Sequence, residues 1–203
     1  MLHLETIEPF ALELLKDLMK KSYLEQFVLV GGTALALQIG HRKSDDLDLF
    51  TIQDFNTNEL IPLLLNDYSV KPTLQMTQTL ICEINNIKVD FIRFKYPFIQ
   101  PIIETDGIRM LSIEDIAPMK LDAITGRGSK KDFYDLYFLL KLFDLNKLFE
   151  LYKAKYPHQT VFHVARSLSY FDDAEHEPEP FVFDKKVTWE KVKRIIRQAV
   201  QKL

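Results

Sequence analysis

The sequence predicts an α/β (α+β) protein in which a mixed β-sheet packs on helices and a mostly helical half follows. Two observations lead to this fold class. Up to about residue 110, short apolar or alternating runs with a period of two stand between helical segments. After residue 110, apolar residues recur at helical spacing. We therefore predict a sheet-containing part, residues 1–110, and a helical part, residues 111–203.

The first part of the chain reads as alternating helices and strands. "PFALELLKDLMKKSYL" is amphipathic, "FVLV" is a buried strand that stops at Gly31-Gly32, and "TALALQIG" is a short helix that ends at Gly40. "DLDLFT" alternates like a strand, and "NTNELIPLLLND" reads as a helix with Pro62 in its first turn. Three strand-like runs follow, which are "VKPTLQMTQ", "TLICEI" and "IKVDFIRF", with Asn85-Asn86 as a hairpin turn between the last two. A loop comes after them.

The second part predicts four helices and one exposed acidic loop. The loop is "DDAEHEPEP", whose prolines and charges disfavour burial. The helices are "SIEDIAPMKLDAIT", "KKDFYDLYFLLKLF", "LNKLFELYKAKY" and "VTWEKVKRIIRQAVQKL". The last one is basic and would suit RNA, but an amphipathic surface helix has the same pattern, and its Trp189 is typical of a packing residue.

Composition narrows the class of protein further. Hydrophobic residues make up 47% and charged residues 27% of the 203 residues, which is an ordinary globular balance. The net charge of −3 does not indicate non-specific nucleic-acid binding. We see neither a signal peptide nor an apolar run long enough for a membrane span, so we expect a soluble, cytoplasmic protein without membrane contact. The single cysteine, Cys82, excludes an intrachain disulfide framework.

Two aspartates alternate with leucines in "DLDLF". On a strand, Asp46 and Asp48 project to the same side, roughly 6–7 Å apart, while Leu47 and Leu49 enter the opposite face. Two like charges so placed repel unless a cation lies between them or one is protonated. Carboxylate oxygens are ligands that Mg²⁺ accepts together with substrate phosphates. The alternative is a solvated strand end.

Two further features point to the same chemistry. Gly31-Gly32-Thr33 lies between a strand and a helix, where the backbone N–H groups of a helix start can bind a phosphate, although a plain tight turn has the same residues. Asp90 interrupts the apolar run "IKVDFI", where an unpaired buried carboxylate would be costly. If the two acidic strands are neighbours, three carboxylates converge as in metal-dependent phosphoryl- or nucleotidyl-transfer sites.

Three blocks of the sequence carry a resemblance to a known family. Together they span about residues 25–143, and they are "LVGGTALALQIGHRKSDDLDLF", "IKVDFI" and "EDIAPMKLDAITGRGSKKDFYDLYFLL". They resemble the AbiEii/AbiGii-type nucleotidyltransferases, a branch of the DNA polymerase β-like superfamily. Most of that superfamily has Gly-Ser where this chain has Gly-Gly-Thr. Residues from 144 onward match nothing that we can assign.

The resemblance implies a role for each matching residue. Asp46, Asp48 and Asp90 would be catalytic and bind metal, whereas the position of Asp45 is variable. The nucleotide would be bound by the glycine turn, by the stretch ahead of the aspartates and by one lysine: Gly31, Gly32, Thr33, Arg42, Ser44 and Lys120. Asp132 matches a further active-site carboxylate, with Lys131 and Asp135 beside it. From spacing alone, Lys131 and Asp135 would form a surface ion pair, and His41 would be a cation at a helix end.

The resemblance also implies an activity. The chain would transfer a nucleoside monophosphate (NMP) from a nucleoside triphosphate (NTP) to an acceptor, with Mg²⁺ or Mn²⁺ as cofactor. Family members often act as toxins beside a cognate antitoxin, and the acceptor can be RNA, for some members tRNA, or a protein. Two alternatives stay open: a non-catalytic NTP- or partner-binding module of the same fold, and a phosphotransferase that moves the γ-phosphate.

Overall fold

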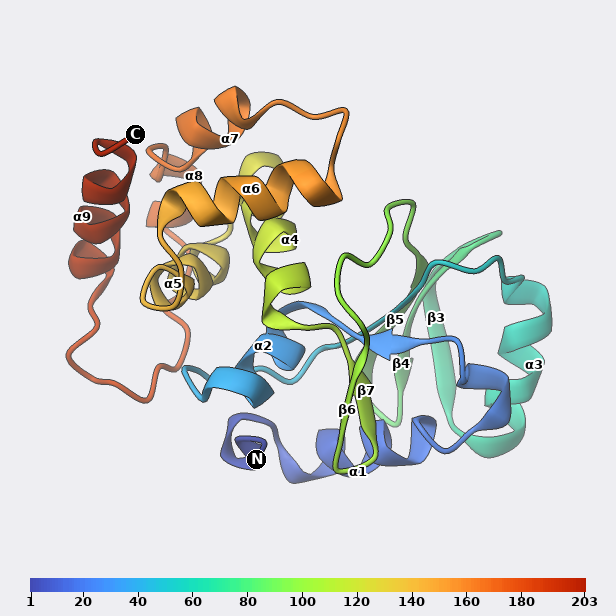
Figure 1. Ribbon diagram of the computed structural model, residues 1–203. Coiled ribbons are helices and arrows are strands. Elements are labelled where there is room, and N and C mark those ends of the chain that lie inside the picture. Colours follow the sequence, from blue (N-terminus) through green and yellow to red (C-terminus); the bar gives the residue numbers. More distant parts are fainter. The chain divides into compact units, whose positions relative to one another are not determined.

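The computed structural model describes residues 1–203, which divide into two compact units (Figure 1). The sheet unit comprises Met1–Gly40 and Ser44–Ser112. The helical unit comprises Ile113–Leu203 together with His41–Lys43. The change of hydrophobic period near residue 110 therefore marks one of the points where the chain passes between the units. The hydrophobic pattern does not predict that His41–Lys43 belong to the helical unit.

A seven-stranded mixed sheet forms the sheet unit, in the order β3-β4-β5-β2-β1-β7-β6. The strands are β1 Val28–Leu29, β2 Leu47–Thr51, β3 Val70–Met76, β4 Thr79–Ile84, β5 Ile87–Arg93, β6 Ile103–Thr105 and β7 Ile108–Met110. β2 runs parallel to β5 and antiparallel to β1, while β1 runs parallel to β7. The predicted fold class, a mixed sheet packed on helices, is confirmed.

Three α-helices and two short 3₁₀-helices accompany the sheet. They are η1 Leu4–Thr6, α1 Pro9–Leu18, η2 Ser22–Leu24, α2 Gly31–Ile39 and α3 Thr57–Asp67. α2 ends as predicted, because Gly40 adopts the left-handed conformation at its C-cap. The expected position of Pro62 was wrong, since it lies inside α3 beyond the first turn. It is exposed there, so water can satisfy the backbone carbonyl that its missing N–H leaves unbonded.

Two of the sheet's hairpins turn on residues with positive φ, in addition to the hairpin that joins β3 and β4. Asn85 and Asn86 have φ values of 52° and 67°, as a two-residue turn between β4 and β5 requires, so the predicted hairpin is confirmed. A second hairpin joins β6 and β7 in the segment that we expected to be a loop. Its turn is Asp106-Gly107, with φ values of 54° and 76°. Asp-Gly is a strong hairpin signal, but the strands on either side are too short to show alternation.

Six helices build the helical unit. They are α4 Ile113–Gly126, α5 Lys130–Leu139, α6 Leu145–Lys155, α7 Val161–Ser167, α8 Asp172–Glu175 and α9 Trp189–Val200. The four predicted helices are confirmed, whereas α7 is additional and α8 falls in the stretch expected to be a loop. α4 packs against α5, α6 and α7, and α5 packs against α9. No helix of the chain combines the length and the apolar character that a membrane crossing needs.

Trp189 anchors α9 in the helical core. Its indole is 5% exposed and lies within 6 Å, centroid to centroid, of the rings of Phe133, Tyr134 and Phe171. The indole N–H donates a hydrogen bond to Glu175 in α8. Trp189 is therefore a packing residue, which agrees with the structural interpretation of this helix and leaves no aromatic face of Trp189 open for stacking on a base.

A buried ion pair joins two helices of the same unit. Lys155 Nζ in α6 lies 2.6 Å from Asp115 Oδ1 in α4, and both side chains are fully buried. Burial lowers the pKa of Lys155, although the Asp115 carboxylate opposes that effect. A charge in such a place is tolerated because its partner is present.

We predict that Lys155→Met lowers the free energy of unfolding by about 3–5 kcal/mol, because Asp115 then stays buried without this ammonium. The double variant Asp115→Leu with Lys155→Met should recover most of the loss. Lys153→Met, at an exposed position of the same helix, is the control and should change little. Urea unfolding followed by circular dichroism measures all four proteins. An unchanged midpoint in Lys155→Met would show that the pair is not a structural tie.

Candidate active site

Two acidic side chains lie side by side on neighbouring strands of the sheet unit. The parallel register of β2 and β5 pairs Asp48 directly with Asp90. Paired residues of adjacent strands point to the same face, so the two carboxylates share one face of the sheet. Asp46 precedes Asp48 by two residues. We call Asp46, Asp48 and Asp90 the carboxylate edge. The expected adjacency of the two acidic strands is thus present.

Asp90 has one carboxylate oxygen without a partner. The residue is 8% exposed, and its Oδ1 is buried without a hydrogen bond. Its Oδ2 lies 3.2 Å from Nζ of Lys88. Burial alone would lower the pKa of Lys88, but the charges of Asp90, Asp46 and Asp48 outweigh it and raise that pKa. All three carboxylates therefore act on one ammonium group.

The carboxylate edge suits a hard divalent cation in its donor chemistry. A buried carboxylate oxygen that lacks a donor is costly, and a bound cation would remove that cost. The chain contains no group of three or more His, Cys, Asp or Glu side chains arranged to hold a metal ion. Mg²⁺ commonly takes only one or two carboxylates and completes its shell with substrate phosphates and water. Asp48 and Asp90 fit that smaller requirement.

The glycine turn packs directly on the carboxylate edge. Gly31 has φ of +70°, and a Cβ placed on it would lie 2.2 Å from Oδ2 of Asp48. The N–H of Val30 donates to the backbone carbonyl of Asp48 at 2.8 Å, which ties the turn to β2. α2 begins at Gly31 without a side-chain cap. Its first N–H groups therefore have the character of an anion site next to the carboxylates.

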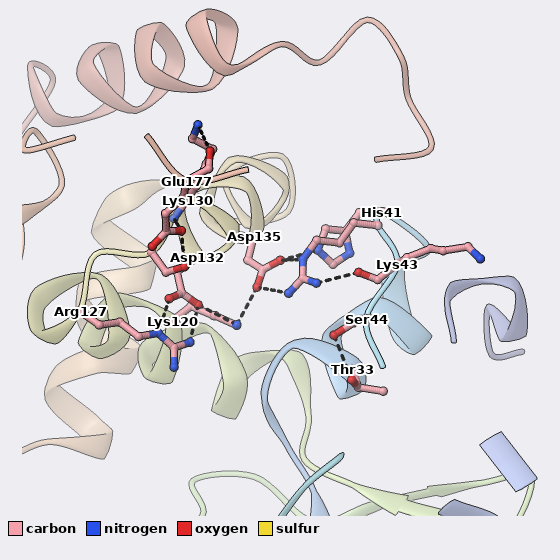
Figure 2. Close-up of polar contacts among 12 residues, drawn as sticks. Thr33, His41, Lys43, Ser44, Lys120, Arg127, Lys130, Asp132, Asp135 and Glu177 are labelled. Atoms are coloured by element: carbon pink, nitrogen blue, oxygen red, sulfur yellow. Dashed lines mark hydrogen bonds and ion pairs between the residues drawn. The ribbon is translucent and has the colours of Figure 1, made fainter. Parts of the chain in front are cut away.

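The side chains of Thr33 and Ser44 serve the backbone that carries the aspartates. The Thr33 hydroxyl donates to the Asp46 carbonyl at 2.5 Å. It is also hydrogen-bonded to the Ser44 hydroxyl at 3.0 Å (Figure 2). Thr33 is 1% exposed. These contacts fix the chain just ahead of β2. Direct contact of either side chain with a nucleotide stays a prediction.

Three further predicted site residues, Arg42, Lys120 and Asp132, lie in a largely buried ionic cluster of the helical unit. We call it the Asp135 network, and its members are His41, Arg42, Lys120, Arg127, Asp132 and Asp135. In Figure 2 the dashed lines from His41 and from Lys120 meet at Asp135. Asp135 accepts hydrogen bonds from His41 Nε2 at 2.7 Å and from Arg42 Nε and Nη2 at 2.6 and 2.9 Å, and Lys120 Nζ lies 2.6 Å away.

Asp132 occupies the other side of Lys120. Its Oδ1 lies 3.0 Å from Lys120 Nζ, and Arg127 donates to both of its oxygens at 2.8 and 3.1 Å. The structure therefore brings Lys120 and Asp132 into direct contact. The expected surface pair between Lys131 and Asp135 was wrong, because Asp135 is completely buried and does not lie at the surface.

The Asp135 network carries more positive than negative charge. Burial raises the pKa of Asp135, but Arg42, Lys120 and the hydrogen bonds from His41 and Arg42 hold it well below the usual range. Burial lowers the pKa of His41, so its imidazole is neutral near pH 7. Three cations then face two carboxylates. The side chain of Arg127 is 59% exposed, so the excess positive charge reaches solvent there.

Sequence patterns missed three members of the Asp135 network, because His41, Arg127 and Asp135 were not predicted as site residues. They also missed Lys88 in the sheet unit, although its two-residue spacing from Asp90 was a usable signal. Arg42, predicted to bind nucleotide, is 3% exposed and holds Asp135 with two of its nitrogens. The helical spacing of the sequence could not reveal a partner 93 positions away.

We predict that Gly31→Ala lowers the free energy of unfolding by about 2–5 kcal/mol, since the left-handed backbone and the clash with Asp48 add up. Gly107→Ala is a matched control: its φ is +76°, and no atom lies within 4 Å of an added Cβ. It should lose only the backbone part, about 1–2 kcal/mol. If urea unfolding gave the same loss of free energy for both variants, the contact between Gly31 and Asp48 would not restrict the residue at this turn.

We also predict that acid weakens the fold through Asp135. Its folded pKa is depressed, so the stability it contributes is present above the unfolded pKa of about 3.9 and is lost as pH falls toward the folded pKa. Asp135→Asn should lower the free energy of unfolding by about 3–5 kcal/mol at pH 7 and flatten its dependence on pH below 4. Asp106→Asn, in an exposed turn, is the control. An equally steep acid profile in Asp135→Asn would contradict this assignment.

Known proteins share both units of this chain. The sequence matches the family model "Nucleotidyl transferase AbiEii toxin, Type IV TA system" over residues 13–106 and 85–201. The match includes the region after residue 144, to which the sequence blocks assigned nothing. Over 199 residues the chain is 36% identical to an uncharacterized protein of Aquifex aeolicus (strain VF5), aq_aa25, and this alignment covers 93% of each chain.

Solved structures show the same fold at low sequence identity. A candidate nucleotidyltransferase from Helicobacter pylori is 20% identical with a TM-score of 0.55, and the match covers 97% of both chains. MenT4, the nucleotidyltransferase toxin Rv2826c from Mycobacterium tuberculosis H37Rv, is 16% identical with a TM-score of 0.54, covering 96% of this chain and 85% of that one. With its family match across both units, the chain belongs to the AbiEii nucleotidyl transferase toxin family and is a nucleotidyltransferase.

Proposed function

We propose that this nucleotidyltransferase moves an NMP group from an NTP to a hydroxyl-bearing acceptor with the help of a divalent cation. The observation that carries the proposal is the side-by-side placement of Asp48 and Asp90 against the Gly31 turn. It joins carboxylate ligands for a cation to backbone donors for a phosphate. This is the pair of features that phosphoryl and nucleotidyl transfer requires.

Asp48 and Asp90 would hold Mg²⁺ or Mn²⁺, with Asp46 on the same edge. The ion, when bound, would stabilise the charge that develops on the transferred phosphate. The N–H groups at the start of α2 would bind phosphate oxygens, and Gly31 leaves the room for their approach. Thr33 and Ser44 would keep the backbone before Asp46 in place.

The acceptor hydroxyl would attack the α-phosphorus while the bond to the β-phosphate oxygen breaks. Pyrophosphate leaves with that electron pair. Asp90 would orient the hydroxyl and take its proton, because its carboxylate stands beside Asp48 on the same face of the sheet. Asp46 and Asp48 would keep the site negative enough to retain the cation.

The Asp135 network would serve the triphosphate. The resemblance assigns Lys120 to that role, and the network holds its ammonium between Asp132 and Asp135. Burial lowers the pKa of Lys120, but the two carboxylates outweigh it and raise that pKa, so the ammonium keeps its charge. We propose that the positive excess of the network supports binding of the triphosphate. A titration with NTP should show that Lys120→Ala binds the nucleotide more weakly than the wild type does.

The biological setting follows from the family. Its members are described as toxins of type IV toxin–antitoxin systems. We propose that this chain acts as such a toxin beside a cognate antitoxin, with RNA, including tRNA, or a protein as the acceptor. The chemistry of the carboxylate edge needs only a hydroxyl group, so it suits either acceptor.

The test is the transfer of label from NTP to a mixture of cellular RNA and protein with Mg²⁺. We expect label from the α-phosphate on the acceptor and none from the γ-phosphate. Transfer of γ-label alone would support a phosphotransferase instead. No transfer of either label, together with tight NTP binding, would support a non-catalytic binding module.

The variant Asp48→Asn separates repulsion from catalysis. Without Mg²⁺ it should melt at the same temperature as the wild type or higher, because one of the repelling charges is gone. Transfer should fall by orders of magnitude, because metal stabilisation is worth several kcal/mol. Mg²⁺ with NTP should raise the melting temperature of the wild type and raise that of the variant much less. Equal shifts of the melting temperature in both proteins, with transfer intact in the variant, would show that these aspartates only form a solvated strand end.

A further inference from the structure

Lys88 is a half-exposed lysine that belongs to neither the family pattern nor the proposed chemistry. It lies on β5 two residues before Asp90, so the two side chains project to the same side of the strand. Its Nζ is 3.2 Å from Asp90 Oδ2. Glu83 on β4 stands directly opposite Lys88 in the register and is exposed. The ammonium is nevertheless paired with Asp90.

This position places one positive charge where a divalent cation would bind. Asp48 is paired in register with Asp90, so the ammonium that contacts Asp90 lies at the edge that carries both carboxylates. Of the two Asp90 oxygens, Oδ1 is buried without a partner and Oδ2 carries the lysine. A cation that uses both Asp48 and Asp90 would therefore meet the charge of Lys88 at its own site.

We propose that Lys88 is a built-in counter-cation of the carboxylate edge, which competes with the divalent ion for Asp90 and yields when the nucleotide phosphates enter. The inference rests on the proposed metal-dependent function and deepens it. In the absence of nucleotide, the ammonium neutralises part of the repulsion among the three aspartates. It thereby weakens the binding of a free divalent ion at the same place.

The lysine is the partner of this pair that can move. Its side chain is 48% exposed and that of Asp90 is 10% exposed, so water can solvate the displaced ammonium while a cation takes its place at the carboxylate. Its long stem allows the ammonium to swing while its backbone stays in the sheet. Nucleotide phosphates would then offer the displaced ammonium a new anionic partner. Metal and nucleotide would accordingly bind with positive coupling, because each removes the obstacle to the other.

Binding of Mn²⁺ without turnover tests this inference. The affinity of the protein for Mn²⁺ is measured by electron paramagnetic resonance, first alone and then with a non-hydrolysable NTP analogue. Lys88→Met should bind Mn²⁺ on the order of tenfold more tightly than the wild type in the absence of nucleotide, as the removal of one nearby positive charge predicts. Lys88→Gln should behave in the same way, and Lys88→Arg should stay close to the wild type. With the analogue present, the advantage of Lys88→Met should shrink or reverse.

Lys71→Met is the matched control, because Lys71 is an exposed lysine on β3 of the same sheet, paired in register with Glu83 of β4. It should leave the Mn²⁺ affinity unchanged. Equal affinity of the wild type and Lys88→Met, or weaker affinity in the variant, would overturn the inference while leaving the metal-dependent function intact. Absence of Mn²⁺ binding in the wild type with and without the analogue would overturn both. Melting temperatures of all variants verify that each is folded.

Discussion

The parallel pairing of β2 with β5 is the constraint on which the chemistry of this protein depends. It sets Asp48 beside Asp90, while Leu47 and Leu49 of the same strand fill the core on the opposite face. A shift of one residue in this register would turn the aspartates into the core and the leucines to the surface. The hydrophobic burial of the leucines therefore holds the acidic pair in place.

The glycine turn depends on the same constraint. Gly31 lies so close to Asp48 that an added Cβ would meet its Oδ2 at 2.2 Å, and Val30 is hydrogen-bonded to the backbone of Asp48. The N–H groups that we propose to bind phosphate and the strand that carries the proposed metal ligands are thus joined by a backbone contact. Sites of this kind gain precision because rigid elements carry them.

In the helical unit, a buried ionic network accompanies the apolar core. Asp135 is completely buried, yet Arg42, Lys120 and His41 surround it with donors. Removing one member would leave buried charge uncompensated, which explains why Arg42 binds Asp135 instead of facing solvent. The network also attaches His41–Lys43 to the helical unit, a few residues before Asp46. The same short stretch of chain thus serves an ionic cluster and precedes the carboxylate edge.

The sequence by itself determined the elements whose signals are local. The period-two runs located β2, β4 and β5, Asn85-Asn86 located their hairpin, and the three ordered blocks identified the family. The ordered aspartates and the glycine turn were also visible, because a charge or a glycine pair inside an apolar run is locally conspicuous. Short strands such as β6 and β7 were missed, since three residues cannot establish a period.

Only the tertiary structure decided which charges are paired with which. Asp135 binds Arg42, which lies 93 positions away in the sequence. Lys88 is paired with Asp90, although Glu83 stands opposite it in the strand register. Spacing along a helix predicts partners only within about one turn, so it assigned Asp135 to Lys131 and to the surface. Burial and long-range contact fix the partners of Asp135, because desolvation favours the selection of donors that lie close to a buried carboxylate in space. That selection depends on distances in space, which the order of residues does not contain.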